Sequence, residues 1–163
     1  GSIPKVAEVD GFSDLVERVG ERLLGPTDLV AQSMGGVIAV ATALRYPALV
    51  RRLVLTATSG GIDATRFHPA DWREDYRRQF PHAAAWITEP RVGWLEDHEL
   101  HRIQAATLLL WGDADPIAPV ALGKHFANLL PRAELVILPG GDQSFAAFRA
   151  AEVAPHIARH LGI

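Results

Sequence analysis

One serine stands in surroundings that could make it a nucleophile. Ser33 lies between two apolar runs, with alanine two positions before it and glycine two and three positions after it. A serine projects from a strand-to-helix turn only if the chain bends sharply beneath it, and large neighbours at these positions would collide. The run therefore predicts a nucleophile elbow, whose Met34 N–H and helix start would stabilise an oxyanion. The alternative is a serine that caps the helix.

The elements that must position this serine alternate between apolar strands and helices. Expected strands cover residues 28–32, 52–58, 107–111 and 133–138, and expected helices cover 12–23, 34–46, 119–130 and 145–161, the last broken near Pro155. Continuous apolar strands separated by helices predict an α/β fold, a parallel sheet with helices on both faces. Its ligand site should lie where the strands end. Besides Ser33, the residues there are Ser59-Gly60-Gly61, then Asp113 and Asp115, and finally Gly140-Gly141-Asp142-Gln143.

Residues 62–104 interrupt this alternation. They hold three of the four tryptophans and many arginines and show no strand pattern, so we expect short helices near 70–79, 82–88 and 94–103. We therefore predict a single domain over residues 1–163 with a small helical lid insertion at about 62–104.

Composition excludes several classes of function. The 163 residues are 48% hydrophobic and carry a formal charge of −3, so a nucleic-acid partner is not expected. There is no cysteine, no phosphate- or dinucleotide-binding glycine motif and no apolar run long enough to cross a membrane. We expect a cytoplasmic protein without a metal or cofactor, whose chemistry comes from serine, histidine, aspartate or glutamate.

Three segments resemble the α/β-hydrolase superfamily. Residues 28–55 carry its S-M-G-G elbow and following strand, residues 103–119 resemble the W-G-x-x-D-x-i-x-P segment that bears its acid, and residues 135–145 resemble its base loop. Their order along the chain is the order that this fold uses. Only Ala31 departs from the elbow pattern, where glycine is usual.

The resemblance implies roles for individual residues. Ser33 matches the nucleophile, Met34 the oxyanion donor and Asp115 the acid, with Asp113 as second choice and turn formation as the alternative for both. The base position holds Gln143. Because glutamine cannot take a proton from serine near neutral pH, the enzyme is expected to be impaired in this form.

The resemblance favours acyl transfer on a small ester-like molecule, as in carboxylesterases, lactonases or thioesterases. Gln32 beside the elbow, and Trp72, Trp86 and Trp94 in the insertion, are expected to contact this substrate. The tryptophans could instead only pack short helices onto the sheet. A non-catalytic ligand-binding or regulatory protein of the same fold, and a haloperoxidase-like member, remain alternatives.

The N-terminal part of the chain departs from the family pattern. Members of the superfamily begin with strands before the elbow and a His-Gly loop, whereas residues 3–9 could form at most one strand. An open sheet edge promotes association. We therefore expect that a missing segment or a partner completes the sheet.

Overall fold

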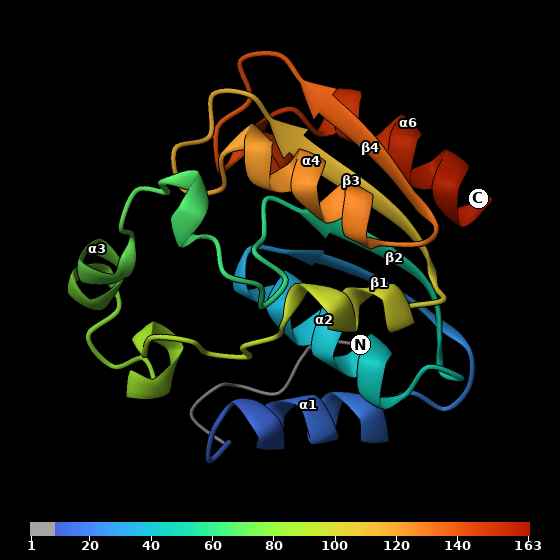
Figure 1. Cartoon of the computed structure of the whole chain (residues 1–163), viewed down its shortest axis with the longest axis horizontal. Coiled ribbons are helices and arrows are strands. Elements are labelled where there is room, and N and C mark those ends of the chain that lie inside the picture. The colour runs from blue at the N-terminus through green and yellow to red at the C-terminus, as the bar shows by residue number, and fades with distance from the viewer. Residues whose placement is uncertain (1–8) are drawn as a thin grey trace.

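The structure is a computed structural model that describes residues 9–163. Its four parallel strands stand in the order β1-β2-β3-β4 (Figure 1). They are β1 (Thr27–Gln32), β2 (Val50–Thr56), β3 (Ala106–Gly112) and β4 (Ala133–Leu138). The middle of β2 and nearly all of β3 are fully buried, because helices cover the sheet on both sides. The predicted α/β class and the parallel sheet are confirmed.

Helices cover the two faces of the sheet unequally. The α-helices of the described residues are α1 (Phe12–Glu21), α2 (Met34–Arg45), α3 (Arg73–Gln79), α4 (Val120–Leu129), α5 (Phe145–Phe148) and α6 (Ala150–Leu161). Helices α2 and α4 lie on one face of the sheet and α6 on the other (Figure 1). Helix α1 packs on α2 rather than on the sheet, where Leu15, Val16 and Ile38 form a second, smaller core.

Strand β1 forms one edge of the sheet. Val30, in the middle of β1, is 56% exposed, whereas its partner Val54 in β2 is fully buried beside it. The apolar side chains of β1 are thus covered on the α2 side and partly open on the other. The strand considered for residues 3–9 lies, apart from Val9, outside the described residues.

The predicted break near Pro155 is wrong. The chain interrupts the last helical segment at Arg149, between α5 and α6, and Pro155 lies inside α6. Proline lacks only one N–H, which would have bonded to the carbonyl of Ala151. Because Ala151 is exposed, water can satisfy that carbonyl and the helix continues.

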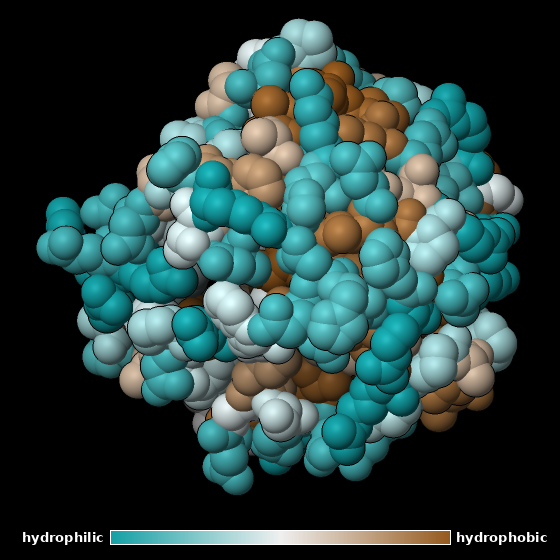
Figure 2. All heavy atoms as spheres, viewed as in Figure 1, coloured by the Kyte–Doolittle hydropathy of each residue, from teal (hydrophilic) through white to brown (hydrophobic). Residues whose placement is uncertain are grey.

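The segment between β2 and β3 contains α3 and three short 3-10 helices, η2 (Thr65–Phe67), η3 (Ala85–Thr88) and η4 (Asp97–Arg102). The part that contains α3 projects from one side of the sheet, at the left in Figure 1, whereas η4 packs against α4. Figure 2 shows that the surface seen from this direction is mostly hydrophilic, with smaller apolar patches. Within residues 9–163, no helix combines the length and apolarity needed to cross a bilayer.

Candidate active site

Ser33 occupies a strained turn between β1 and α2. Its backbone angles are φ 52° and ψ −124°, a left-handed conformation that a residue with a side chain adopts only under constraint. The Ser33 N–H donates to the carbonyl of Thr56 at 3.0 Å, which ties the turn to the neighbouring strand. The Ser33 hydroxyl makes no capping bond to α2. The turn therefore has the geometry of a nucleophile elbow rather than of a serine cap.

Small residues around Ser33 allow this turn in different ways. A Cβ on Gly35 would lie 3.8 Å from the Cβ of Ala31, an ordinary contact, so an alanine at position 31 fits the elbow. A Cβ on Gly36 would lie about 2.5 Å from the side chain of Thr58. Thr58 cannot move easily, because its Oγ1 donates to the Ser33 carbonyl at 2.6 Å. Gly36 is thus the glycine on which close packing of α2 depends.

Gly36→Ala is expected to lower the free energy of unfolding by about 1–3 kcal/mol, because the added methyl group overpacks against Thr58. Gly35→Ala meets only an ordinary contact, at 3.8 Å from the Cβ of Ala31, and should change stability by less than about 1 kcal/mol. Urea denaturation of both variants measures the difference. Equal losses in the two variants would contradict the assigned contact.

Asp115 follows β3 and is buried at 5% exposure. One of its oxygens, Oδ1, accepts the N–H groups of Ile117 at 2.8 Å and Ala118 at 3.0 Å. The indole of Trp111 also holds this turn, because its Nε1–H donates to the Ala118 carbonyl at 2.9 Å. Burial raises the pKa of Asp115, with a smaller contribution in the same direction from Asp142, although the two N–H donors oppose the shift.

The raised pKa of Asp115 predicts a pH dependence of stability. The folded chain binds this proton more tightly than the unfolded chain, so the carboxyl makes folding less favourable as the pH rises above 3.8. Asp115→Asn removes the titration. We expect its stability relative to the unaltered chain to increase between about pH 4 and about pH 7 in urea denaturation series. A difference that stays constant or shrinks over this range would show that the pKa is not raised.

The loops after β3 and β4 are joined directly. The Ala114 N–H donates to the Gly141 carbonyl at 3.0 Å, and a Cβ on Gly112 would lie 2.0 Å from that same oxygen. Asp113, the second choice for the acid, accepts the N–H of Gly140 at 2.6 Å and so closes this junction. The close approach explains why glycine must end β3. It also brings the loop after β4 next to Asp115.

Gln143 lies between Ser33 and Asp115. We assign its amide with the nitrogen toward Asp115, because the opposite assignment would set its oxygen against the carboxylate. The amide then donates to Asp115 Oδ2 at 2.5 Å and Oδ1 at 3.1 Å, and its oxygen accepts from Ser33 Oγ at 3.2 Å. The three predicted residues therefore form one hydrogen-bonded chain, with Gln143, at the position predicted for the base, in its middle.

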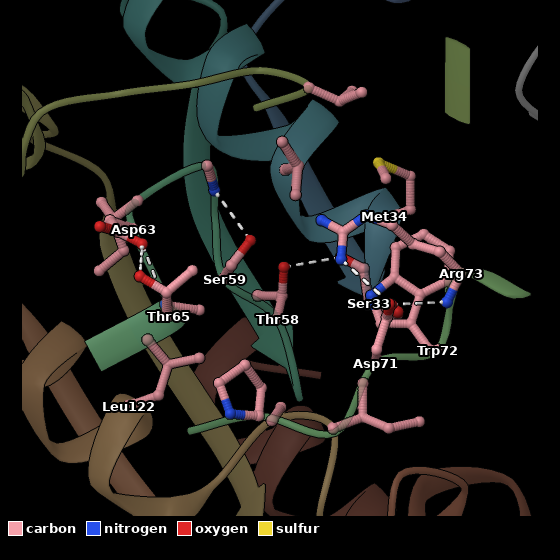
Figure 3. Close-up of a pocket in the computed structure, with 18 of the residues that line it drawn as sticks. Ser33, Met34, Thr58, Ser59, Asp63, Thr65, Asp71, Trp72, Arg73 and Leu122 are labelled. Atoms are coloured by element: carbon pink, nitrogen blue, oxygen red, sulfur yellow. Dashed lines mark hydrogen bonds and ion pairs between the residues drawn. The ribbon is translucent and has the colours of Figure 1, made fainter. Parts of the chain in front are cut away.

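A cavity of about 710 Å³ has Ser33 and Gln143 in its wall. Much of the rest of its wall comes from the segment between β2 and β3, including Trp72, whose side chain Figure 3 shows together with Ser33 and Met34. Trp94 also lines this cavity. The first residue of α2 is Met34, so its N–H has no partner within the helix and remains available to a ligand oxygen.

Two residues expected at the substrate do not line the cavity. The side-chain amide of Gln32 donates to the Gln143 carbonyl at 2.7 Å, so Gln32 holds the loop that carries Gln143. Trp86 packs against Phe12 of α1, with ring centroids 6.4 Å apart. Nothing in the sequence distinguishes these packing and supporting roles from contact with a ligand. This holds both for an exposed glutamine at a strand end and for an aromatic residue in a helical segment.

Two cavity residues were not among the predicted site residues. Thr58, just after β2, supports the elbow through its bond to Ser33, and Arg73 at the start of α3 lines the cavity. The position of Thr58 at a strand end was a usable signal. For Arg73 the only signal was an arginine among several in the same segment.

Comparison with known proteins shows which family and which proteins this chain resembles. Residues 4–86 match the family described as alpha/beta hydrolase fold. The chain is 29% identical over 189 residues to a poly(3-hydroxyalkanoate) depolymerase of Ectopseudomonas oleovorans, covering 93% of this chain and 66% of that protein. It is 26% identical over 169 residues to the 2-hydroxy-6-oxo-2,4-heptadienoate hydrolase of Pseudomonas putida, covering 80% of this chain and 59% of that protein. The chain thus spans less than two thirds of the length of these relatives.

Solved structures share the fold at low identity. A meta-cleavage product hydrolase mutant from Pseudomonas fluorescens superposes with a TM-score of 0.74 at 17% identity, covering 93% of this chain and 72% of that one. A putative non-heme bromoperoxidase from Mycobacterium tuberculosis gives a TM-score of 0.73 at 18% identity, with 93% and 74% covered. At such identities the likeness shows the fold alone.

Proposed function

This chain belongs to the alpha/beta hydrolase fold family, and on that premise we propose that it is a serine hydrolase that acts by acyl transfer through Ser33, impaired in this form by Gln143. The proposed substrates are small carboxylic esters, thioesters or lactones. The single observation that carries the proposal is the hydrogen-bonded chain from Ser33 through Gln143 to Asp115. The relatives named as a depolymerase and as a hydrolase support a hydrolytic reaction.

Each side chain has a defined task in the proposed reaction. The Ser33 oxygen attacks the carbonyl carbon of the ester, and the negative charge that develops on the carbonyl oxygen faces the Met34 N–H. A base at position 143 takes the hydroxyl proton and passes it to the leaving alcohol, while Asp115 orients that base. Water then attacks the acyl group on Ser33 with help from the same base, and the acid product is released.

Gln143 stops this sequence at its first proton transfer. Its amide oxygen accepts a hydrogen bond from Ser33 but cannot hold the proton, because an amide is not basic near neutral pH. Serine without a base is a weak nucleophile. The bound ester would therefore persist in the cavity.

This persistence favours a second candidate function, a ligand-binding protein without turnover. The observation in its favour is Gln143 itself, which satisfies both Ser33 and Asp115 and leaves neither polar group unpaired. In that case the cavity holds a ligand and Ser33 is inert.

Labelling with a fluorophosphonate separates the two functions. The Gln143→His chain should become covalently labelled at Ser33, and the chain with both Gln143→His and Ser33→Ala should remain unlabelled, as mass spectrometry of the intact chains would show. Labelling only in the first chain supports the hydrolase. No labelling in either chain would favour the binding protein and end the proposal of acyl transfer.

A further inference from the structure

Two arginines share the cavity wall with Ser33. Arg73 begins α3 and Arg91 lies between η3 and η4. Each guanidinium lies over a tryptophan ring that also lines the cavity, Arg73 over Trp72 at 5.3 Å and Arg91 over Trp94 at 4.5 Å from the ring centroid. Stacking on an aromatic ring holds a guanidinium in place and leaves its N–H groups at the ring edge free to bind.

Neither arginine is fully neutralised by the protein. Within residues 9–163, the Arg91 side chain makes no hydrogen bond and no ion pair. Its backbone has φ 64°, a conformation that costs energy for a residue with a side chain. Arg73 reaches only Asp71, at 3.4 Å through one Nη, and its Nε is buried without a hydrogen-bond partner among the described residues. The buried Nε of Arg73 is thus an unsatisfied charged donor beside the cavity, whereas Arg91 is exposed and its N–H groups can exchange water for a ligand, and both features favour an anionic ligand.

Carboxylate side chains also line the cavity, and their positions decide whether they neutralise the two arginines. Asp63 accepts both the N–H and the hydroxyl of Thr65, and Figure 3 shows this pair on the opposite side of the view from Ser33 and Arg73. Hydrogen bonds from Thr65, with smaller effects from nearby arginines including Arg91, lower the pKa of Asp63. Asp71 is 72% exposed in its side chain, and Glu89 is exposed as well. Apart from the one contact of Asp71 with Arg73 at 3.4 Å, these carboxylates face solvent or their own loop, so the arginines keep N–H groups for a ligand.

We propose that Arg73 and Arg91 select esters that carry a second, free carboxylate group, which the two guanidinium groups bind while the ester lies at Ser33. The inference rests on the proposed function, because the carboxylate is recognised as part of the ester substrate. Apolar side chains such as Met34, Ile117 and Leu122 line the same cavity and would contact the hydrocarbon chain between the two groups. The substrate class is thus a half-ester of a dicarboxylic acid or a molecule with the same two ends.

The test compares monoethyl adipate, which has one carboxylate, with the neutral diethyl adipate. Binding to the unaltered chain is followed by tryptophan fluorescence, because Trp72 and Trp94 line the cavity. The half-ester should bind at least about 10-fold more tightly than the diester, and Arg73→Gln and Arg91→Gln should each remove most of that preference. Added salt should weaken the preference, because it rests on charge.

Arg77→Gln is the matched control, since Arg77 is exposed on the same helix as Arg73 and does not line the cavity. It should keep the full preference. Equal binding of both esters, binding of neither, or the same loss in Arg77→Gln would each overturn the inference. Its failure is distinct from that of the hydrolase: labelling of Ser33 in the Gln143→His chain without a carboxylate preference removes only the role of the arginines, whereas the preference without labelling removes only the acyl transfer.

Discussion

Gln143→His is expected to raise kcat/KM for short p-nitrophenyl esters by at least about 10³-fold, because loss of a triad member costs several orders of magnitude in rate. The side chain at position 143 already reaches both required partners, with its oxygen near Ser33 Oγ and its nitrogen near Asp115. An imidazole placed there has one ring nitrogen for each partner. It can therefore take the serine proton while the carboxylate orients the ring.

The matched control for this gain is the chain with both Gln143→His and Ser33→Ala. It keeps the new imidazole but lacks the hydroxyl, so a general increase in ester hydrolysis by exposed histidine would survive in it. The gain should disappear in this double variant. A rate that is unchanged by Gln143→His, or one that persists without the serine, contradicts a nucleophilic Ser33.

Asp115→Asn, made in the Gln143→His chain, should lower kcat by about 10³- to 10⁴-fold, since an amide at this position favours the wrong tautomer of the base. The fold should tolerate the change, because an asparagine oxygen can still accept the N–H groups of Ile117 and Ala118. Steady-state kinetics with the same esters measures the loss. Circular dichroism confirms that the variant is folded.

Asp113→Asn provides the comparison, because Asp113 has the same side chain two residues away but bonds to the N–H of Gly140 instead of facing Gln143. Its kcat in the Gln143→His chain should stay within about 10-fold. If Asp113→Asn caused the large loss and Asp115→Asn did not, the assignment of the acid would be wrong.

Local features of this chain were predictable because neighbouring residues encode them. The continuous apolar run at 107–111 indicated a buried strand, and β3 covers it with one residue more at each end. The small residues around Ser33 predicted a sharp turn, and its φ of 52° shows that turn. In both cases the physical constraint acts within a few residues along the chain, where the sequence displays it directly.

Other features depended on which surface happened to be nearby. The periodicity of the last helical segment could not show whether the chain would break at Arg149 or at Pro155, because that depends on how α5 and α6 pack. Trp86 looked like Trp72 and Trp94 in the sequence, yet it packs on α1. An aromatic side chain follows whichever apolar surface is closest, and the chain order of residues does not give that distance.

The sequence alone determined the family, the alternation of strands and helices, and the absence of a basic side chain at position 143. Only the tertiary structure decided that Gln143 bonds both Ser33 and Asp115, that Gln32 holds its loop, and that Arg73 and Arg91 line the same cavity. The physical reason is that residue types and their short-range spacing can be seen directly in the sequence. Contacts between its distant loops are set instead by the register of the parallel strands and by the packing of the loops that join them.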